Sequence, residues 1–339
     1  MRLVPALSDD VHIADVTPTI VDRVVGCLKG IAIGDAIGKQ TETLSREDVR
    51  RWYPQGVRGF EGPTGTVIPR YVGNSKSEWR FGETTDDTER TLAVARAIIA
   101  DRRVSHVTVG REMLGCRKGV HPGVPSLWEF HRAGDPTRMA TAHEGCGAAI
   151  RVAPVGILHA SASLNELVNG AREASISTHG GSLAIAAAAA TTAAVSAAID
   201  GAASHEVLEF AERAAAHAER QWPGNLPDTF ASAVRTVHDD LARTPVLRAA
   251  DVANCCFPDR PLTIVPLALG LATLMRSAED AILLAANVGG DSDSVASIAG
   301  GILGAMYPDT VNQHWYDVVE SVNHHDLVTI ASELSKLRY

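Results

Sequence analysis

Apolar residues recur at helical spacing along most of the chain. From Thr19 onward, Val21, Val24, Val25 and Leu28 recur at spacings of three and four residues, the spacing of a helix face. Similar patterns predict helices over 88–100, 164–175, 182–200, 205–220, 228–242, 262–276, 278–286, 294–306 and 312–336. The only strand signal in the sequence is a weak one near 66–72. The pattern predicts an all-α protein with one large core.

A stripe of glycines follows one face of the first predicted helix, at Gly26, Gly30, Gly34 and Gly38. Each interior glycine costs a helix about 0.5–1 kcal/mol relative to alanine. The stripe makes sense if a second backbone lies close against this face. Tight packing of two helices is therefore the favoured interpretation, and a binding role nearby is compatible with it.

Two segments lack a regular period. Residues 1–17 are predicted to be a flexible N-terminal arm, and residues 44–84 are rich in glycine, proline and polar groups. A long irregular segment inside a compact domain is usually functional or mobile. No composition break marks a second domain, so residues 18–339 are predicted to form a single domain.

Composition excludes several classes of protein. The 339 residues carry a formal net charge of −9, with 45% hydrophobic residues. This is too apolar for disorder, and the acidic balance disfavours non-specific binding to nucleic acid or anionic membranes. The five cysteines show no C-x-x-C spacing, which disfavours a disulfide framework or structural zinc. The uncharged stretch Leu183–Ile199 is mostly alanine, so a buried helix is favoured over a membrane span. We expect a reduced, soluble, cytoplasmic protein.

The first candidate for chemistry is Thr84-Thr85-Asp86-Asp87-Thr88, directly before the helix predicted over 88–100. Threonine and aspartate are preferred at helix N-termini, so capping alone is one explanation. One helix start needs only one cap, however. Two adjacent carboxylates flanked by hydroxyls exceed that need.

The second candidate is Gly289-Gly290-Asp291-Ser292-Asp293-Ser294, before the helix predicted over 294–306. Here too the acids exceed what a cap requires. Together the two clusters offer four carboxylates and several hydroxyls, the oxygen ligands that Mg²⁺, Ca²⁺ or Mn²⁺ prefer. If the clusters meet in the fold, their charges repel unless cations lie between them. We therefore hypothesise a two-metal site.

Three further segments are weak signals when taken singly. Glycines 145 and 147 flank Cys146 before a helix-like stretch, and such a turn can expose N–H groups to phosphate. His179 precedes the alanine-rich helix, where a cap or core hydrogen bond is the simpler role. Glu42 by itself is a surface acid.

The order of these segments resembles the ADP-ribosylglycohydrolase family, the family of the dinitrogenase-reductase-activating glycohydrolases. The resemblance covers about residues 22 to 310. The segments that carry it are Gly34-Asp35-Ala36-Ile37-Gly38 with Glu42, Thr85-Asp86-Asp87-Thr88, Gly145-Cys146-Gly147-Ala148-Ala149-Ile150-Arg151-Val152-Ala153-Pro154, Thr178-His179, and Asn287-Val288-Gly289-Gly290-Asp291-Ser292-Asp293-Ser294.

The resemblance implies a compact, single-domain orthogonal helical bundle with two Mg²⁺ or Mn²⁺ ions. It implies catalytic roles for Glu42, Asp86 and Asp293. The metal ligands implied are Thr85, Asp86, Asp87, Asp291, Asp293 and Ser294, where members usually carry threonine in place of Ser294. The substrate-binding residues implied are Gly145, Cys146, Gly147, Ala148, His179 and His121.

The implied activity is hydrolysis at the anomeric carbon of an ADP-ribosyl group. The implied partner is an ADP-ribosylated protein or a small ADP-ribosyl or nucleotide glycoside, with nucleic acid only as a modified substrate. Cys146, His121-Pro122-Gly123 and Glu89 depart from common family residues, which leaves the leaving group open. The alternatives are an N-glycosidase acting on a small nucleoside or nucleotide, and a non-catalytic ligand-binding relative.

Overall fold

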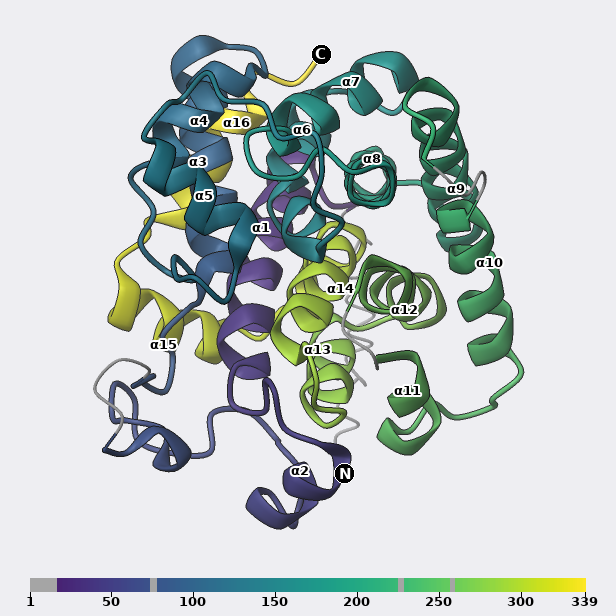
Figure 1. The fold of residues 1–339 in the computed structure, drawn as a ribbon. Coiled ribbons are helices and arrows are strands. Elements are labelled where there is room, and N and C mark those ends of the chain that lie inside the picture. The colour runs from purple at the N-terminus through teal and green to yellow at the C-terminus, as the bar shows by residue number, and fades with distance from the viewer. Residues whose placement is uncertain (1–16, 74–77, 225–228, 257–259) are drawn as a thin grey trace, which may run out of the picture.

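Helices make up almost all the regular structure of the described residues, which are 17–73, 78–224, 229–256 and 260–339 of the computed structural model (Figure 1). Within them the only β-type pairing outside the helices is an isolated bridge between Val67 and Arg80. The all-α prediction is confirmed, and the weak strand near 66–72 amounts to this one bridge. The α-helices are α1 (Ile20–Gly38), α2 (Arg46–Trp52), α3 (Asp86–Asp101), α4 (His106–Met113), α5 (Pro125–Ala133), α6 (Ala153–Leu158), α7 (Leu164–Ser175), α8 (Ser182–Ile199), α9 (Ser204–Gln221), α10 (Thr229–Ala242), α11 (Ala249–Cys256), α12 (Pro261–Leu274), α13 (Ala278–Ala286), α14 (Ser292–Met306), α15 (Gln313–Asn323) and α16 (Leu327–Ser335).

Helices α1 and α14 lie side by side through the middle of the molecule (Figure 1). A Cβ atom added at Gly26 would lie 2.1 Å from the Gly304 carbonyl oxygen, and one at Gly30 would lie 2.1 Å from that of Gly300. Gly34 meets Ala296 in the same way. The two helices are therefore antiparallel and in backbone contact. The interpretation of the stripe as close packing is confirmed.

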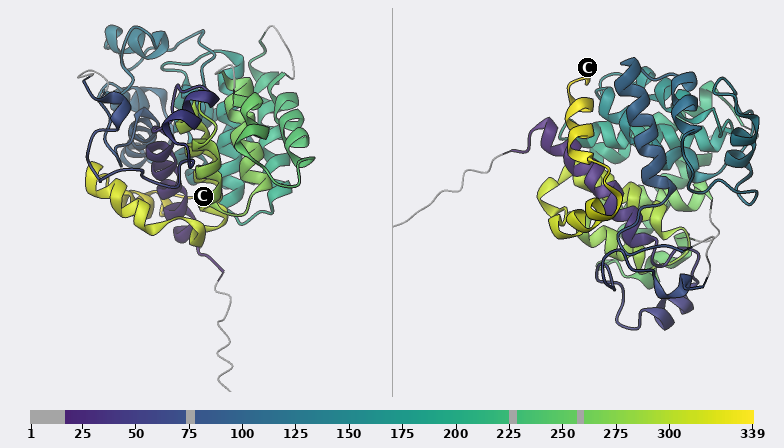
Figure 2. Two further views of the ribbon diagram at one scale, coloured as in Figure 1. Left: turned by 90° about the horizontal axis from the view of Figure 1, so that it is seen from below. Right: turned by 90° about the vertical axis from the view of Figure 1, so that its left-hand side faces the viewer.

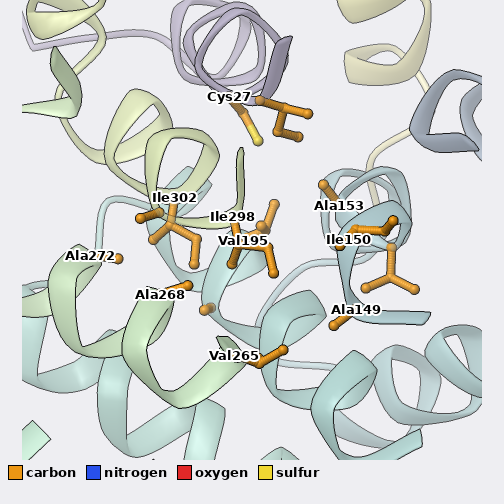
Figure 3. Packing of buried hydrophobic residues seen from close by; sticks show 14 of the residues in the cluster. Cys27, Ala149, Ile150, Ala153, Val195, Val265, Ala268, Ala272, Ile298 and Ile302 are labelled. Atoms are coloured by element: carbon orange, nitrogen blue, oxygen red, sulfur yellow. The ribbon is translucent and has the colours of Figure 1, made fainter. Parts of the chain in front are cut away.

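The alanine-rich helix α8 is a core helix. It is the one described helix that is long and apolar enough to cross a membrane, but 89% of that stretch is buried inside the protein. Most of its own side chains are alanines, and its Val195 faces Ile298 and Ile302 of α14, with Ala268 of α12 beside them (Figure 3). Small residues let helices approach closely at interior packing density, so the buried interpretation of this stretch is confirmed.

The helix predicted over 312–336 is instead two helices, α15 and α16. The break falls at His324 and Asp326, whose φ angles are 55° and 56°. This left-handed conformation is uncommon outside glycine, asparagine and aspartate, so it ends the helix despite an apolar period that continues. The pair wraps one side of the molecule, and α16 lies beside α1 (Figure 2).

Helices α2, α4, α5, α6 and α11 were not predicted, because helices of nine residues or fewer span at most about two and a half turns and carry little periodicity. Segment 44–84 is mostly irregular, yet it contains α2, whose N-cap Ser45 accepts a hydrogen bond from the Asp48 N–H. Helix α1 begins where predicted, since Thr19 and Asp22 form a reciprocal capping box. Apart from Thr17, the predicted N-terminal arm lies outside the described residues.

Candidate functional site

Asp35, in the middle of α1, fixes the start of α3. Its fully buried carboxylate accepts hydrogen bonds from the backbone N–H of Thr85 at 2.9 Å and of Thr88 at 3.0 Å, and from the Thr88 hydroxyl at 2.5 Å. A negative charge at a helix N-terminus is favourable. Helix α1 thus positions the first acid cluster, Asp86 and Asp87. No role could be assigned to Asp35 from the sequence, although an acid on an apolar helix face was a usable signal.

The end of the same helix fixes the start of α14. A Cβ atom at Gly38 would lie 2.5 Å from the Asp293 Cα atom. The Ser292 hydroxyl donates to the Gly38 carbonyl at 2.9 Å and lies 3.0 Å from the Thr41 hydroxyl. Because Asp35 and Gly38 are one helical turn apart, the two acid clusters meet at this end of α1.

The meeting of these acids shows in their electrostatics. Burial, reinforced by Asp35, Asp86 and Asp291, raises the pKa of Asp87 well above its ordinary value. Burial together with Glu42, Asp291 and Asp87 does the same to the pKa of Asp293. Charged groups that repel one another at this range need a counter-charge. The two clusters are one electrostatic unit.

Glu42 belongs to the same unit. Burial raises the pKa of its carboxyl, Lys39 opposes that rise, and Asp291 and Asp86 add to it. The side chain retains 26% exposure, so it lies at the edge of the cluster rather than inside it. Glu42 is therefore no ordinary surface acid.

Capping does not account for the acids. The cap of α3 is Thr85, whose hydroxyl accepts from the Asp87 N–H at 3.3 Å. Asp291 occupies the N-cap position of α14 but makes no side-chain capping bond; its carboxylate instead accepts from the Cys146 thiol at 3.1 Å. Asp86 pairs with Arg90 at 2.5 Å. The carboxylates of Asp86 and Asp291 are thus not used to cap α3 and α14.

The oxygen donors suit a hard cation. The buried Oδ2 atom of Asp87 has no hydrogen-bond partner, and a buried carboxylate oxygen without a donor is costly. Thr85 and Ser294 place buried hydroxyls in the same two segments. Among the described residues, no group of three or more His, Cys, Asp or Glu side chains has a geometry that could already hold a metal ion. Asp86 and Asp291 instead point to Arg90 and Cys146, so ion binding would require these local bonds to open.

The glycine segment lies beside the acids. Cys146 begins the 3₁₀ helix Cys146–Arg151 and contacts Asp291. Cβ atoms added at Gly145 and Gly147 would lie 3.1 and 3.2 Å from the Nε2 atom of His179. Any other residue at these two positions would crowd the imidazole. Ala148 is fully buried, so neither its methyl group nor its backbone is open to a ligand in this structure.

Arg151 ties this segment to His179. Its fully buried guanidinium donates to the carbonyls of Gly147, Ala174 and Ser175, each at 2.9 Å, and to the Thr178 hydroxyl at 2.8 Å. The Thr178 hydroxyl in turn lies 2.8 Å from the Nδ1 atom of His179. Burial, with Arg151 and Arg90 nearby, lowers the pKa of His179 well below its ordinary value. The imidazole is neutral, and because arginine only donates, the Thr178 hydroxyl is free to donate to Nδ1. We therefore assign the ring proton to Nε2, which faces the glycine segment.

We expect Thr178→Val to disturb this arrangement without unfolding the protein. The isosteric change removes the hydroxyl that joins Arg151 to His179, which costs about 1–2 kcal/mol of stability. The imidazole then loses its fixed tautomer. Nitrogen chemical shifts of His179 should move toward a mixture of tautomers in the variant; unchanged shifts would show that Thr178 does not set the proton position.

Two further residues singled out from the sequence make local contacts, and the substrate-binding role of His121 stays a prediction. His121 is exposed, and its Nδ1 atom accepts from the Gly123 N–H of its own turn at 3.1 Å; in the described part of the chain no hydrogen bond or ion pair joins it to the acids. Glu89 accepts from the backbone N–H groups of Arg117 and Lys118, and so anchors the following loop.

Comparison with known proteins agrees with this architecture. The sequence model of the ADP-ribosylglycohydrolase family matches residues 16–339. An uncharacterized protein of Archaeoglobus fulgidus is 27% identical over 82% of this chain and 86% of its own. The ADP-ribosylarginine hydrolase Tri1 of Serratia proteamaculans is 26% identical over 87% of this chain and 75% of its own.

A solved structure titled ADP-ribosylglycohydrolase-related protein complex superposes with a TM-score of 0.69 at 22% identity, covering 94% of this chain and 99% of that one. It shares the fold. The family model thus matches nearly the whole sequence, and the solved structure has the same arrangement of helices. The chain belongs to the ADP-ribosylglycohydrolase family.

Proposed function

We propose that the protein is a divalent-cation-dependent glycosidase that hydrolyses the bond at the anomeric carbon of an ADP-ribosyl conjugate. The observation that carries the proposal is the convergence of Asp86 and Asp87 with Asp291 and Asp293 beside the Gly145–Gly147 segment. Family membership supports the reaction class, and the Serratia relative is named for hydrolysis of ADP-ribosylarginine.

The residues that would hold two Mg²⁺ or Mn²⁺ ions are Thr85, Asp86, Asp87, Asp291, Asp293 and Ser294. Their oxygen-only chemistry fits such ions, and the partnerless Oδ2 atom of Asp87 fits a ligand. When bound, such ions lower the pKa of water and polarise sugar oxygens.

The chain's own groups supply the rest. Glu42 lies outside this ligand set, at the edge of the cluster, and its carboxylate can accept a proton from the attacking water. The neutral His179 presents its Nε2–H beside the glycine segment, where it can donate to a phosphate oxygen. The N-termini of α3 and α14 also favour an anionic ligand. These groups bind and orient an ADP-ribosyl group although the protein as a whole is acidic.

The test is a turnover screen with purified protein, with and without Mg²⁺ or Mn²⁺. The substrates are ADP-ribose linked to arginine, to serine and to nucleic acid. We expect metal-dependent release of ADP-ribose from at least one of them. No release from any conjugate would remove the proposal.

A second candidate is a glycosidase acting on a small nucleoside or nucleotide. The observation that favours it is the Cys146 thiol bonded to Asp291, since this places a thiol next to the glycine segment. Thermal-shift competition between ADP-ribose and a nucleotide panel separates the two candidates. Tight binding of ADP-ribose alone would count against the second one.

The metal-free protein should lose stability as pH rises. Because the pKa values of Asp87, Asp293 and Glu42 are raised in the folded state, the folded protein binds more protons than the unfolded chain above the ordinary carboxyl pKa of about 4. The free energy of unfolding therefore falls with increasing pH. Between pH 5 and 7.5 we expect a fall on the order of 1 kcal/mol or more, one pKa unit being about 1.4 kcal/mol.

Urea unfolding in EDTA and in saturating Mg²⁺ measures this effect. Added Mg²⁺ should flatten the pH dependence, because the ion replaces the protons. An equal slope in both buffers would show that the carboxylates do not share a cation.

A further inference from the structure

The ammonium group of Lys39 is a positive charge that the fold holds beside the acids. It is the residue immediately after α1 and is only 8% exposed. Its ammonium group forms an ion pair with Glu42 and lies 4.4 Å from the ring centre of Trp79 and 5.9 Å from that of Tyr71. Two aromatic faces and a carboxylate are the usual surroundings of a bound cation. The protein has thus built a cage for its own ammonium group.

The cage is held in place by Arg70. Its Nη2 atom donates to the carbonyl oxygens of Glu42 at 2.6 Å and Lys39 at 3.3 Å, and contacts the Tyr71 hydroxyl. Its guanidinium carbon also lies 4.2 Å from the Tyr71 ring centre. Lys39 is therefore a fixed charge rather than a mobile surface lysine.

The caged ammonium and the second acid cluster interact. Gly38, directly before Lys39, packs on the Asp293 backbone. Burial acts to lower the pKa of Lys39, but Glu42 and then Asp293 outweigh it and raise that pKa above its ordinary value. Lys39 reciprocally lowers the pKa of Asp293. The ammonium thus stays charged and faces carboxylates that a divalent ion would also use.

We propose that Lys39 is a tethered counter-cation that neutralises Glu42 and Asp293 when no divalent ion is bound, and that a divalent ion binding on this side of the cluster must displace its ammonium group. This inference rests on the proposed metal dependence. Arg90 forms an ion pair with Asp86 at the start of α3. Each of the two acid clusters therefore has one basic side chain beside it.

Calorimetric titration of metal-stripped protein with MgCl₂ and with MnCl₂ tests the proposal. In Lys39→Met, the weaker of the binding steps should become at least tenfold tighter, because the competing charge is gone. The metal-free variant should melt at a lower temperature, since Glu42 and Asp293 lose their neutralising partner. Lys39→Arg, which keeps the charge, should bind metal as the wild type does.

Lys29→Met is the matched control. Lys29 lies on α1, ten residues before Lys39; its ammonium group lies 4.1 Å from the ring centre of Tyr316 and donates to Gln313 at 2.9 Å, so it is held against α15. Its loss should leave metal affinity unchanged. Metal affinity that is unchanged or weaker in Lys39→Met would overturn the role of Lys39 while leaving the metal site intact. Absence of binding to every variant and to the wild type would overturn the proposed metal dependence as well.

A wild-type measurement covers the case in which Lys39→Met does not fold. Acetylation of Lys39 by acetic anhydride, followed by mass spectrometry, should speed up several-fold in saturating Mg²⁺ because the ammonium leaves its cage. The rate at Lys29 should not change. Equal protection of Lys39 with and without Mg²⁺ would overturn the proposal.

Discussion

Replacing Asp293 by asparagine should reduce metal-dependent turnover at least 100-fold, about 2.7 kcal/mol in the activation barrier. The change keeps the shape of the side chain but removes a charge and an anionic oxygen. Asp293 is 3% exposed and lies among other carboxylates. Its substitution should therefore raise the melting temperature of the metal-free protein while activity falls. Loss of activity with a gain of stability is the signature of a functional acid held under repulsion.

The control for this experiment is Asp239→Asn. Asp239 lies on α10, far along the chain from both acid clusters, with a half-exposed side chain that pairs with its neighbour His238 at 3.2 Å. Turnover by Asp239→Asn should match the wild type. If Asp293→Asn retained more than a tenth of the activity, Asp293 could not be an essential part of the site.

Replacing Gly34 by alanine should destabilise the protein by about 2–3 kcal/mol, the upper part of the range for overpacked cores. Inside an isolated helix the same change would stabilise by about 0.5–1 kcal/mol. In the folded protein the new Cβ atom would lie 2.2 Å from the Ala296 carbonyl oxygen. The Cβ position is fixed by the backbone of α1 and the oxygen belongs to the backbone of α14, so neither atom can turn aside. Chemical denaturation of the variant measures the sign and the size of the effect.

Gly270→Ala is the matched control within helix α12. Its added Cβ atom would lie 3.1 Å from a methyl group of Leu241, and the next atoms, at 3.8 Å and beyond, are at ordinary contact distance; a side-chain end can shift. We expect this variant to be neutral or slightly stabilised. A stabilised Gly34→Ala would mean that α1 and α14 are not in backbone contact. Activity should also fall in Gly34→Ala, because the same contact fixes Asp293 against Gly38.

The long helices and the close packing of the first helix against a second backbone could be predicted from the sequence. Apolar periods identified most helices of ten residues or more, and glycines at steps of four predicted that a second backbone packs against α1, although not that it belongs to α14. Both signals are local, because each depends on residues that follow one another within about one helical turn. The His324 and Asp326 break was missed because it depends on backbone conformation, which an apolar period does not report.

The site was predictable as a set of segments but not as a set of contacts. Acids beyond the needs of capping marked both helix starts, and their order along the chain pointed to the family. The bond from Asp35 to Thr85 joins residues 50 positions apart, and Cys146 contacts Asp291 across 145 positions. Such pairings are set by how helices cross. The contact of Lys39 with Trp79 could not be predicted either, because Trp79 lies in a segment without a periodic pattern.

The most direct test of the account is a crystal structure of the protein soaked in MnCl₂, with anomalous diffraction used to locate manganese. We predict anomalous density between the start of α3 and the start of α14, within coordination distance of Asp86, Asp87, Asp291 and Asp293. Manganese found only on surface acids, with these four carboxylates uncoordinated, would contradict the account.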